Sequence, residues 1–166
     1  MLSGKTAFIT GSNRGIGKAI LEKFLENGAD VICAVRKIDD KFLDYINSQS
    51  KKFNKEIKIL QFDLSDENAI KSSIEDLYNK KIDLDILVNN AGIPGGSLTE
   101  MTSIKSLRNI FEINFFSQIK VTQLLLRLLK KSSNASIINI GSVSGLLAER
   151  GTLTYGSSKA ALMFAT

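Results

Sequence analysis

The sequence predicts a doubly wound α/β fold, in which helices cover both faces of a parallel sheet. Three observations support this fold. Short apolar runs of strand length alternate with amphipathic helical stretches along the whole chain. A glycine-rich turn, residues 10–17 (TGSNRGIG), joins the first of these runs to the first helix. Glycine or polar residues follow each of the five predicted strands, at the sheet edge where such folds bind their ligands.

The predicted strands are short and apolar, as strands buried on both faces are. They cover residues 6–9, 31–35, 57–62, 86–88 and 136–140. Strands that alternate with helices pair in parallel through right-handed crossovers, which gives three layers: helix, sheet and helix. A nucleotide site at the first turn makes this a Rossmann arrangement. We expect one domain over residues 1–166.

The predicted helices follow from apolar residues at spacings of three and four. They run from residue 16 to a stop signal at 27–28, over 39–52, 66–79 and about 103–130, and from near 152 to the chain end. Phe42, Leu43 and Ile46 are predicted to form the inward stripe of the second helix. Either Ser65 or Asp66 is expected to cap the third.

Composition excludes several classes of function. With 43% hydrophobic and 23% charged residues, this chain of 166 residues is predicted to be folded and globular. The net charge of +5 comes from scattered lysines, so we expect no nucleic-acid partner, and the single Cys33 is expected to be a buried thiol. The absence of histidine excludes histidine acid–base catalysis, and no metal site is predicted. No run has the length of a signal peptide or a membrane span, so we expect a cytoplasmic protein without a membrane partner.

The glycine turn suits phosphate. Glycine tolerates unusual backbone angles, and its missing side chain lets a ligand approach the main chain. The free N–H groups and the positive dipole end of the following helix point at whatever binds there, which favours an anion. The spacing is G-x-x-x-G-x-G, which differs from the G-x-G-x-x-G dinucleotide fingerprint. A plain strand–helix connection is therefore the alternative interpretation, and residues further along the chain decide between the two.

Tyr155 and Lys159 are four residues apart and so share one face of the last predicted helix. A tyrosine with its ordinary pKa of about 10 is a poor acid–base catalyst near neutral pH. A lysine ammonium nearby favours the phenolate and lowers that pKa. An isolated pair of this kind is more often a solvated helix surface, so its interpretation depends on the motifs around it.

Five motifs together resemble those of the short-chain dehydrogenase/reductase family. They are residues 10–17, residues 89–92 (NNAG), Asn114, Ser142 and residues 155–159 (YGSSK), with Ser142 thirteen residues before Tyr155. The resemblance extends from about residue 4 to the chain end. It implies an oxidoreductase that transfers a hydride between a nicotinamide cofactor and a small-molecule carbonyl or alcohol. The alternative is a non-catalytic dinucleotide-binding regulator on the same fold, which has no need of the last three motifs together.

The resemblance also implies a role for each matching residue. Tyr155 is expected to be the general acid or base, Lys159 to bind the nicotinamide ribose, and Ser142 to hydrogen-bond the reacting oxygen. Asn114 is expected to hold a water that links Lys159 to solvent. The residues expected to bind the cofactor, besides Tyr155 and Lys159, are Gly11, Asn13, Arg14, Gly15, Ile16, Gly17, Arg36, Asp63, Leu64, Asn90, Ala91 and Gly92.

The cofactor is predicted to be NADP(H), with NAD(H) the less favoured alternative. An acidic residue at the end of the second strand would bind the ribose of NAD, whereas an arginine accommodates the 2′-phosphate of NADP. Here the strand ends in Arg36, with no acid until Asp39, and Arg14 supplies a second cation from the glycine turn. The alternative for Arg36 is a solvated loop charge. The resemblance places Asp63 at the adenine and Asn90 at the ribose nearest the nicotinamide.

Two further expectations concern assembly and length. Region 103–130 is apolar on more than one face, and family members commonly pair through this helix and the tyrosine–lysine helix, so we expect a homodimer or homotetramer. The chain ends seven residues after Lys159, and we expect it to be truncated after the fifth strand and its following helix. The sheet would then finish on an exposed edge, and these residues alone would be inactive. The substrate stays open among 3-oxoacyl thioesters, sugar derivatives, steroid-like ketones and small alcohols.

Overall fold

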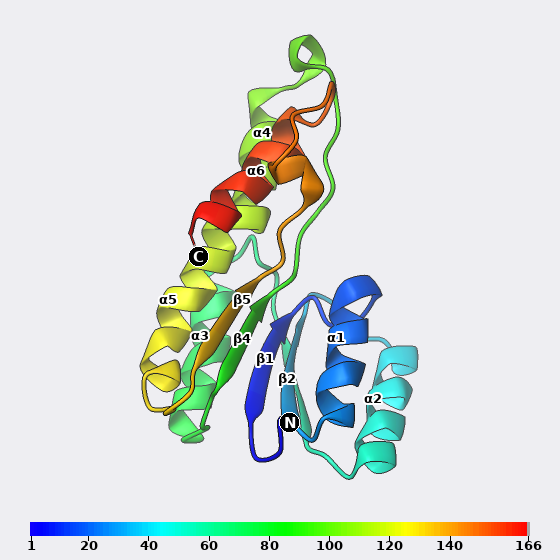
Figure 1. The fold of residues 1–166 in the computed structure, drawn as a ribbon, viewed down its shortest axis with the longest axis vertical. Coiled ribbons are helices and arrows are strands. Elements are labelled where there is room, and N and C mark those ends of the chain that lie inside the picture. Colours follow the sequence, from blue (N-terminus) through cyan, green and yellow to red (C-terminus); the bar gives the residue numbers. More distant parts are fainter. Residues whose placement is uncertain (166) are drawn as a thin grey trace.

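Five parallel strands form one sheet in the computed structural model, which describes residues 1–165 (Figure 1). The strands are β1 (Thr6–Thr10), β2 (Asp30–Val35), β3 (Ile57–Gln61), β4 (Ile86–Asn89) and β5 (Ser136–Asn139). Their order across the sheet is β3-β2-β1-β4-β5. The chain therefore steps outward from β1 to β3 and then returns to the other side of β1, which confirms the predicted doubly wound arrangement.

Helices pack on both faces of this sheet, and each face has its own apolar core (Figure 1). One face is covered by α1 (Gly15–Glu26) and α2 (Asp40–Phe53), and the other by α3 (Glu67–Asn79) and α5 (Ser117–Leu129). Successive strand residues point to opposite faces. In β1, Phe8 therefore joins the core beneath α3 and α5, whereas Ala7 and Ile9 join the core beneath α1 and α2.

Two helices begin directly after a residue whose side chain caps their first turn. Asp66, one of the two predicted caps, accepts a hydrogen bond from the backbone of α3 at 3.0 Å, and Asp39 caps α2 in the same way at 2.8 Å. One inward side chain is predicted wrongly, because Leu43 is 39% exposed. The buried residues of α2 are Phe42 and Ile46, and one residue along a helix rotates the side chain by about 100°, which carries Leu43 to the flank.

The long helix predicted over 103–130 is interrupted near its middle. It consists of α4 (Ile104–Phe111), a π-helical turn η2 (Glu112–Phe116) and α5. At the end of η2 the N–H of Ser117 donates to the carbonyl of Glu112, five residues back instead of four. The apolar side chains of this region differ in exposure: Phe116 is 54% exposed, whereas Val121 and Leu125 are buried. Pairing of copies through this region stays a prediction.

Two short helical turns and the last helix lie beyond the carboxyl ends of the strands (Figure 1). A short turn η1 (Thr99–Met101) precedes α4, a second turn η3 (Val143–Gly145) follows β5, and α6 (Leu153–Phe164) packs against α4 and η2. The last helix begins where predicted and ends at Phe164, while Thr166, to which the prediction extended, lies outside the described residues. β5 is an edge strand, as expected, and its Ile137 and Ile138 are 37% and 40% exposed. Among residues 1–165, no helix combines the length and apolar character that crossing a membrane requires.

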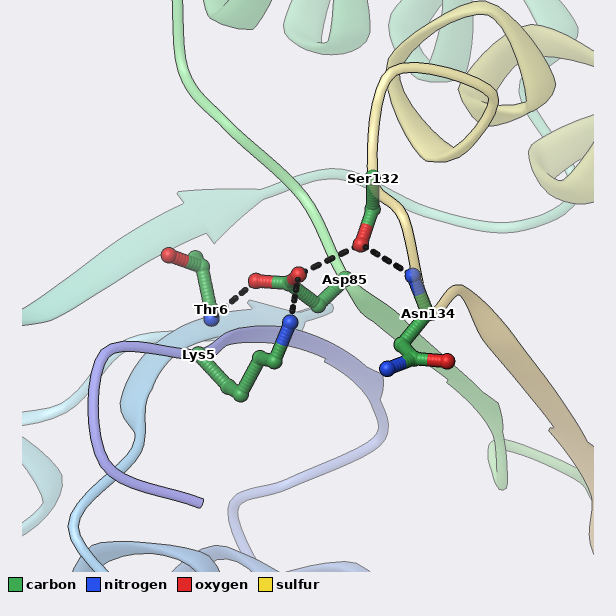
Figure 2. Close-up of polar contacts among 5 residues, drawn as sticks. All are labelled: Lys5, Thr6, Asp85, Ser132 and Asn134. Atoms are coloured by element: carbon green, nitrogen blue, oxygen red, sulfur yellow. Dashed lines mark hydrogen bonds and ion pairs between the residues drawn. The ribbon is translucent and has the colours of Figure 1, made fainter.

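At the opposite end of the sheet, one carboxylate ties three parts of the chain together (Figure 2). Asp85 precedes β4 and accepts hydrogen bonds from Nζ of Lys5 at 2.7 Å and from the N–H of Thr6 at 3.0 Å. The hydroxyl of Ser132, in the α5–β5 connection, donates to it at 2.6 Å. Burial by itself raises the pKa of Asp85, but these hydrogen bonds together outweigh burial and hold the pKa below its ordinary value.

Asp85→Ala should therefore lower the free energy of unfolding by about 2–3 kcal/mol at pH 7, since it removes charge-assisted hydrogen bonds. A carboxylate whose folded pKa is depressed stabilises the fold above its unfolded pKa of about 3.9, and the stabilisation is lost as the pH falls through the folded pKa. Urea unfolding at pH 7 and near pH 3 should show the difference between parent and variant shrinking in acid.

The matched control for this measurement is Asp83→Ala, two residues away at an exposed carboxylate. It should change the free energy of unfolding by less than about 0.5 kcal/mol. An Asp85→Ala loss that is the same at both pH values would contradict the role of the carboxylate charge.

Candidate active site

The place for a ligand follows from the strand order. β1 lies between β2 and β4, and the helices that follow β1 and β4 pack on opposite faces of the sheet. Doubly wound sheets bind their ligands at such a switch point, outside the carboxyl ends of the strands. The glycine turn follows β1 and residues 89–92 reach the end of β4, so both predicted binding segments lie at this point.

The first turn of α1 approaches the end of β4 so closely that only glycine fits at one position. A Cβ at Gly17 would lie 2.2 Å from the carbonyl oxygen of Gly11 and 2.4 Å from Nδ2 of Asn90. That Nδ2 donates to the carbonyl oxygens of Thr10 and Gly11, at 2.9 and 3.1 Å. Gly15 has a different role, since its φ is +55° and, apart from its chain neighbours and the backbone of its own helix, no described atom lies within 4 Å of its Cβ position.

The N-terminus of α1 faces this open space. Among residues 1–165, no side chain caps the helix start, where Arg14 is the N-cap residue. The first N–H groups of a helix have no partner within the helix, and the helix dipole adds partial positive charge there. The start of α1 is therefore suited to an anion such as a pyrophosphate.

A cleft of about 750 Å³ opens beside the glycine turn, within the roughly 300–1,000 Å³ typical of small-molecule and cofactor sites. It is lined by all twelve residues that the sequence places at the cofactor outside the last helix, namely Gly11, Asn13, Arg14, Gly15, Ile16, Gly17, Arg36, Asp63, Leu64, Asn90, Ala91 and Gly92. Lys37, Asp39, Ile93 and Ile113, which the sequence analysis does not single out as binding residues, line it as well. The structure thus brings the predicted binding segments of four strands to one cleft.

Around this cleft the arginine side chains are exposed, whereas the carboxylates are hydrogen-bonded to neighbouring residues. Arg14 and Arg36 are exposed at its rim. The carboxylates are engaged locally: Asp39 caps α2, and Asp63 accepts hydrogen bonds from the N–H and the hydroxyl of Ser65, at 2.9 and 2.7 Å. These two bonds, the first of them most strongly, hold the pKa of Asp63 below its ordinary value, with a smaller contribution from the charge of Arg36.

Lys159 and Asn114 meet beside Gly92. From the position of a Cβ at Gly92, Oδ1 of Asn114 lies 3.1 Å away and Nζ of Lys159 lies 3.5 Å away. Lys159 is only 3% exposed, and its Nζ donates to the carbonyl of Ile140 at 2.7 Å. Burial lowers the pKa of Lys159. A lysine ammonium carries three donors, so this group can also bind hydroxyl groups of a ligand beside Gly92.

Asn114 is fixed within η2 by its own hydrogen bonds. Its Oδ1 accepts from the N–H of Ile93 at 2.8 Å, and its Nδ2 donates to the carbonyl of Ile93 and to the hydroxyl of Ser158, both at 3.0 Å. The side chain therefore ties the segment after β4 to α6. The expected role of Asn114 in holding a water stays a prediction.

Ser142 and Tyr155 flank this pair from neighbouring elements. Ser142 follows β5 and caps η3, where its hydroxyl accepts from the N–H of Ser144 at 3.2 Å. Tyr155 is half-buried in the first turn of α6, one turn before Lys159, and η3 packs against this helix. These residues lie beyond the lining of the cleft, on the elements next to its end at Gly92.

The sequence assigns no individual role to two polar residues at this site, Thr10 of the glycine-rich turn and Gln118. The hydroxyl of Thr10 accepts hydrogen bonds from the N–H groups of Asn90 and Ala91, both at 2.9 Å. Gln118 is fully buried and hydrogen-bonded to Thr10. A sequence clue to Gln118 is that it is a polar residue between the apolar residues of α5, four positions after Asn114.

Comparison with known proteins supports the family resemblance of the sequence motifs. The family model described as short chain dehydrogenase matches residues 5–166. The 3-oxoacyl-[acyl-carrier-protein] reductase FabG of Buchnera aphidicola subsp. Schizaphis graminum is 34% identical over 163 residues, covering 96% of this chain and 63% of that protein. The NADPH-dependent 3-dehydrocapnine reductase of Ornithobacterium rhinotracheale is 36% identical over 163 residues, covering 94% of this chain and 56% of that protein.

The fold comparison agrees. The crystal structure of a dehydrogenase/reductase from Sinorhizobium meliloti 1021 has a TM-score of 0.91 at 31% identity, and the match covers 99% of this chain and 65% of that one. This chain thus spans 63% and 56% of the lengths of the two relatives named above. The match to the family model and the identity with the first relative agree with the order of the motifs in the sequence and with the strand order of the sheet. The chain belongs to the short-chain dehydrogenase family.

Proposed function

We propose that the protein is an NADPH-dependent oxidoreductase that reduces a carbonyl group of a small molecule to an alcohol. The observation that carries this proposal is the buried ammonium of Lys159 beside Asn114 and Gly92, at the end of a cleft that the glycine turn lines. Among residues 1–165 no carboxylate pairs with this ammonium, and burying an ammonium without such a partner costs stability. A regulator that only sensed a nucleotide would have no need of Asn114, Ser142 and the Tyr155–Lys159 pair together, so their joint presence beside the cleft favours the enzyme.

The residues of the cleft fit a dinucleotide. The start of α1 suits the pyrophosphate, because Gly15 has no side chain that would cover the N–H groups of the first helical turn. Asp63 keeps its charge and can accept a hydrogen bond from the adenine, and Lys159 can hold the ribose at the other end. When bound, the cofactor supplies the hydride.

Preference for NADPH over NADH is supported by the rim of the cleft. Arg14 and Arg36 are exposed there, and an arginine accommodates the 2′-phosphate that distinguishes NADP. Asp39, the first acid after β2, is occupied in capping α2. One relative at 36% identity is named as NADPH-dependent.

In this proposal Tyr155 protonates the substrate oxygen. The carbonyl carbon gains the hydride and its oxygen gains the phenolic proton, which leaves Tyr155 as a phenolate. The ammonium of Lys159, one turn along α6, supplies a positive charge on the same face of the helix as that phenolate. The hydroxyl of Ser142 accepts a hydrogen bond from its own turn and so keeps its proton to donate to the same substrate oxygen.

The substrate class in this proposal is a carbonyl compound. A 3-oxoacyl thioester is the first to test, because a relative at 34% identity is named as a 3-oxoacyl-[acyl-carrier-protein] reductase. Sugar derivatives, steroid-like ketones and small ketones are the alternatives, and a panel that contains all four classes distinguishes them.

Tyr155→Phe should reduce the kcat for carbonyl reduction by about 10²–10⁴-fold, since general acid–base groups typically contribute that much. Its affinity for NADPH should stay within about twofold of the parent, because only the proton-transferring oxygen is lost. The variant and its matched control are tested in the full-length protein, where turnover is followed by loss of NADPH absorbance and affinity by fluorescence titration.

The matched control for Tyr155 is Tyr45→Phe in α2, which removes a hydroxyl that donates to Glu22. It should leave kcat unchanged. Near-parental turnover in Tyr155→Phe would refute the role of Tyr155. A full-length protein that binds NADPH but reduces no member of the panel would favour the regulator.

Arg36→Asp should weaken NADPH binding by about 10–100-fold, because charge-assisted hydrogen bonds to a phosphate contribute about 1.5–3 kcal/mol. The affinity for NADH should stay the same or rise, since an acid can bind the ribose hydroxyls. Lys105→Asp, an equal charge change on the exposed side of α4, should leave both affinities unchanged. Equal affinities of the parent for the two cofactors would contradict the NADPH preference.

A further inference from the structure

Gln118 is a buried amide whose hydrogen-bonding atoms are all engaged. It lies in the first turn of α5 and is 0% exposed. Its Oε1 accepts a hydrogen bond from the hydroxyl of Thr10 at 3.2 Å. Its Nε2 donates to the carbonyl of Ala91 at 3.0 Å and to that of Ile113 at 3.3 Å. Because Nε2 faces two carbonyls, the orientation of the amide is determined by its partners.

The hydroxyl of Thr10 needs this partner. Both of its lone pairs are occupied, because it accepts from the N–H groups of Asn90 and Ala91 at 2.9 Å each. Its single proton must therefore be donated elsewhere. Oε1 of Gln118 is the nearer acceptor at 3.2 Å, and the carbonyl of Val88 lies at 3.4 Å. Gln118 thereby orients the Thr10 hydroxyl so that it can hold the two N–H groups after β4.

One side chain thus joins three separate parts of the site. Through Thr10, Gln118 reaches the last residue of β1, directly before the glycine turn. Through Ala91 it reaches the segment that lines the cleft after β4. Through Ile113 it reaches η2, the π-helical turn that carries Asn114.

We infer that Gln118 is a positioning residue for the dinucleotide cleft, which sets the spacing between the glycine turn and residues 89–92 through Thr10 and Ala91. Gln118 does not line the cleft itself. It acts on the ligand through the walls that it holds, so its loss is felt as weaker cofactor binding. This inference rests on the proposed function, since it takes a nicotinamide dinucleotide as the ligand of the cleft.

The test is a double-mutant cycle between Gln118→Met, which is nearly isosteric but cannot make these bonds, and Thr10→Val, which removes the hydroxyl. Each single variant should bind NADPH about tenfold more weakly than the parent in a fluorescence titration. The double variant should bind no more weakly than about tenfold, because both changes remove the same link. Thr10→Ser keeps a hydroxyl and should retain the parental affinity.

A control separates positioning from general destabilisation. Ser132→Ala removes one hydrogen bond to Asp85 at the other end of the sheet, so it should lower the melting temperature and leave NADPH affinity within about twofold of the parent. Gln118→Asn, whose amide is one methylene too short to reach Thr10, replaces Gln118→Met in the cycle if the latter does not fold, with the same tenfold loss expected.

Each outcome has one meaning. Affinity of Gln118→Met within twofold of the parent, or a double-variant loss equal to the product of the two single losses, would overturn the positioning role of Gln118. A parent that binds neither NADPH nor NADH would refute the proposed function instead. A tenfold loss that Thr10→Ser avoids and that does not multiply in the double variant supports the inference.

Discussion

The contact between the first turn of α1 and the segment after β4 leaves no space for a side chain, and the shape of the binding cleft depends on it. Gly17 lies against the carbonyl of Gly11 and the amide of Asn90. That amide in turn bonds to the backbone at the end of β1. Since protein interiors are close-packed and transmit strain, the three segments hold one another in place. The walls of the cleft are therefore set by close backbone contacts and by side-chain amides that bond to them.

The two ends of the sheet are held by different chemistry. At the amino ends of the strands a charged carboxylate, Asp85, joins β1, β4 and the approach to β5. At the carboxyl ends the links are neutral amides and a hydroxyl, among them Thr10 and Gln118. Neutral groups do not change charge with pH. The link between the glycine turn and residues 89–92 is thus less sensitive to acid than the opposite end of the sheet.

Much of the fold and the cleft could be predicted from the sequence, because the relevant signals are local. Apolar runs mark the strands, and the carboxyl ends of parallel strands meet at one edge, so residues as far apart as Gly11 and Asn90 were expected together. The π-helical turn was not predicted, because one extra residue in a turn barely alters a 3.6-residue pattern. The partners of Lys159 and Gln118 lie far away in the chain, so only the folded structure identifies them.

The roles of the individual site residues are harder to predict from the sequence than their positions. Sequence places Asn114, Ser142, Tyr155 and Lys159 in one motif order, and the structure brings Asn114 and Lys159 to Gly92 with the other two on adjoining elements. Proton transfer depends on hydroxyl geometry relative to a substrate, which neither residue order nor a parallel sheet specifies.

The exposure of Arg14 and Arg36 has a consequence for the history of such a protein. Both stand at the rim, whereas Gly17, Asn90 and Thr10 are packed between backbone segments. Substitutions at exposed positions usually change stability by less than about 0.5 kcal/mol. Under the proposed function, a descendant of this chain could therefore exchange NADPH for NADH without an unstable ancestor in between. Selection on metabolism, and not on folding, would then decide which of the two nucleotides the proposed reductase uses.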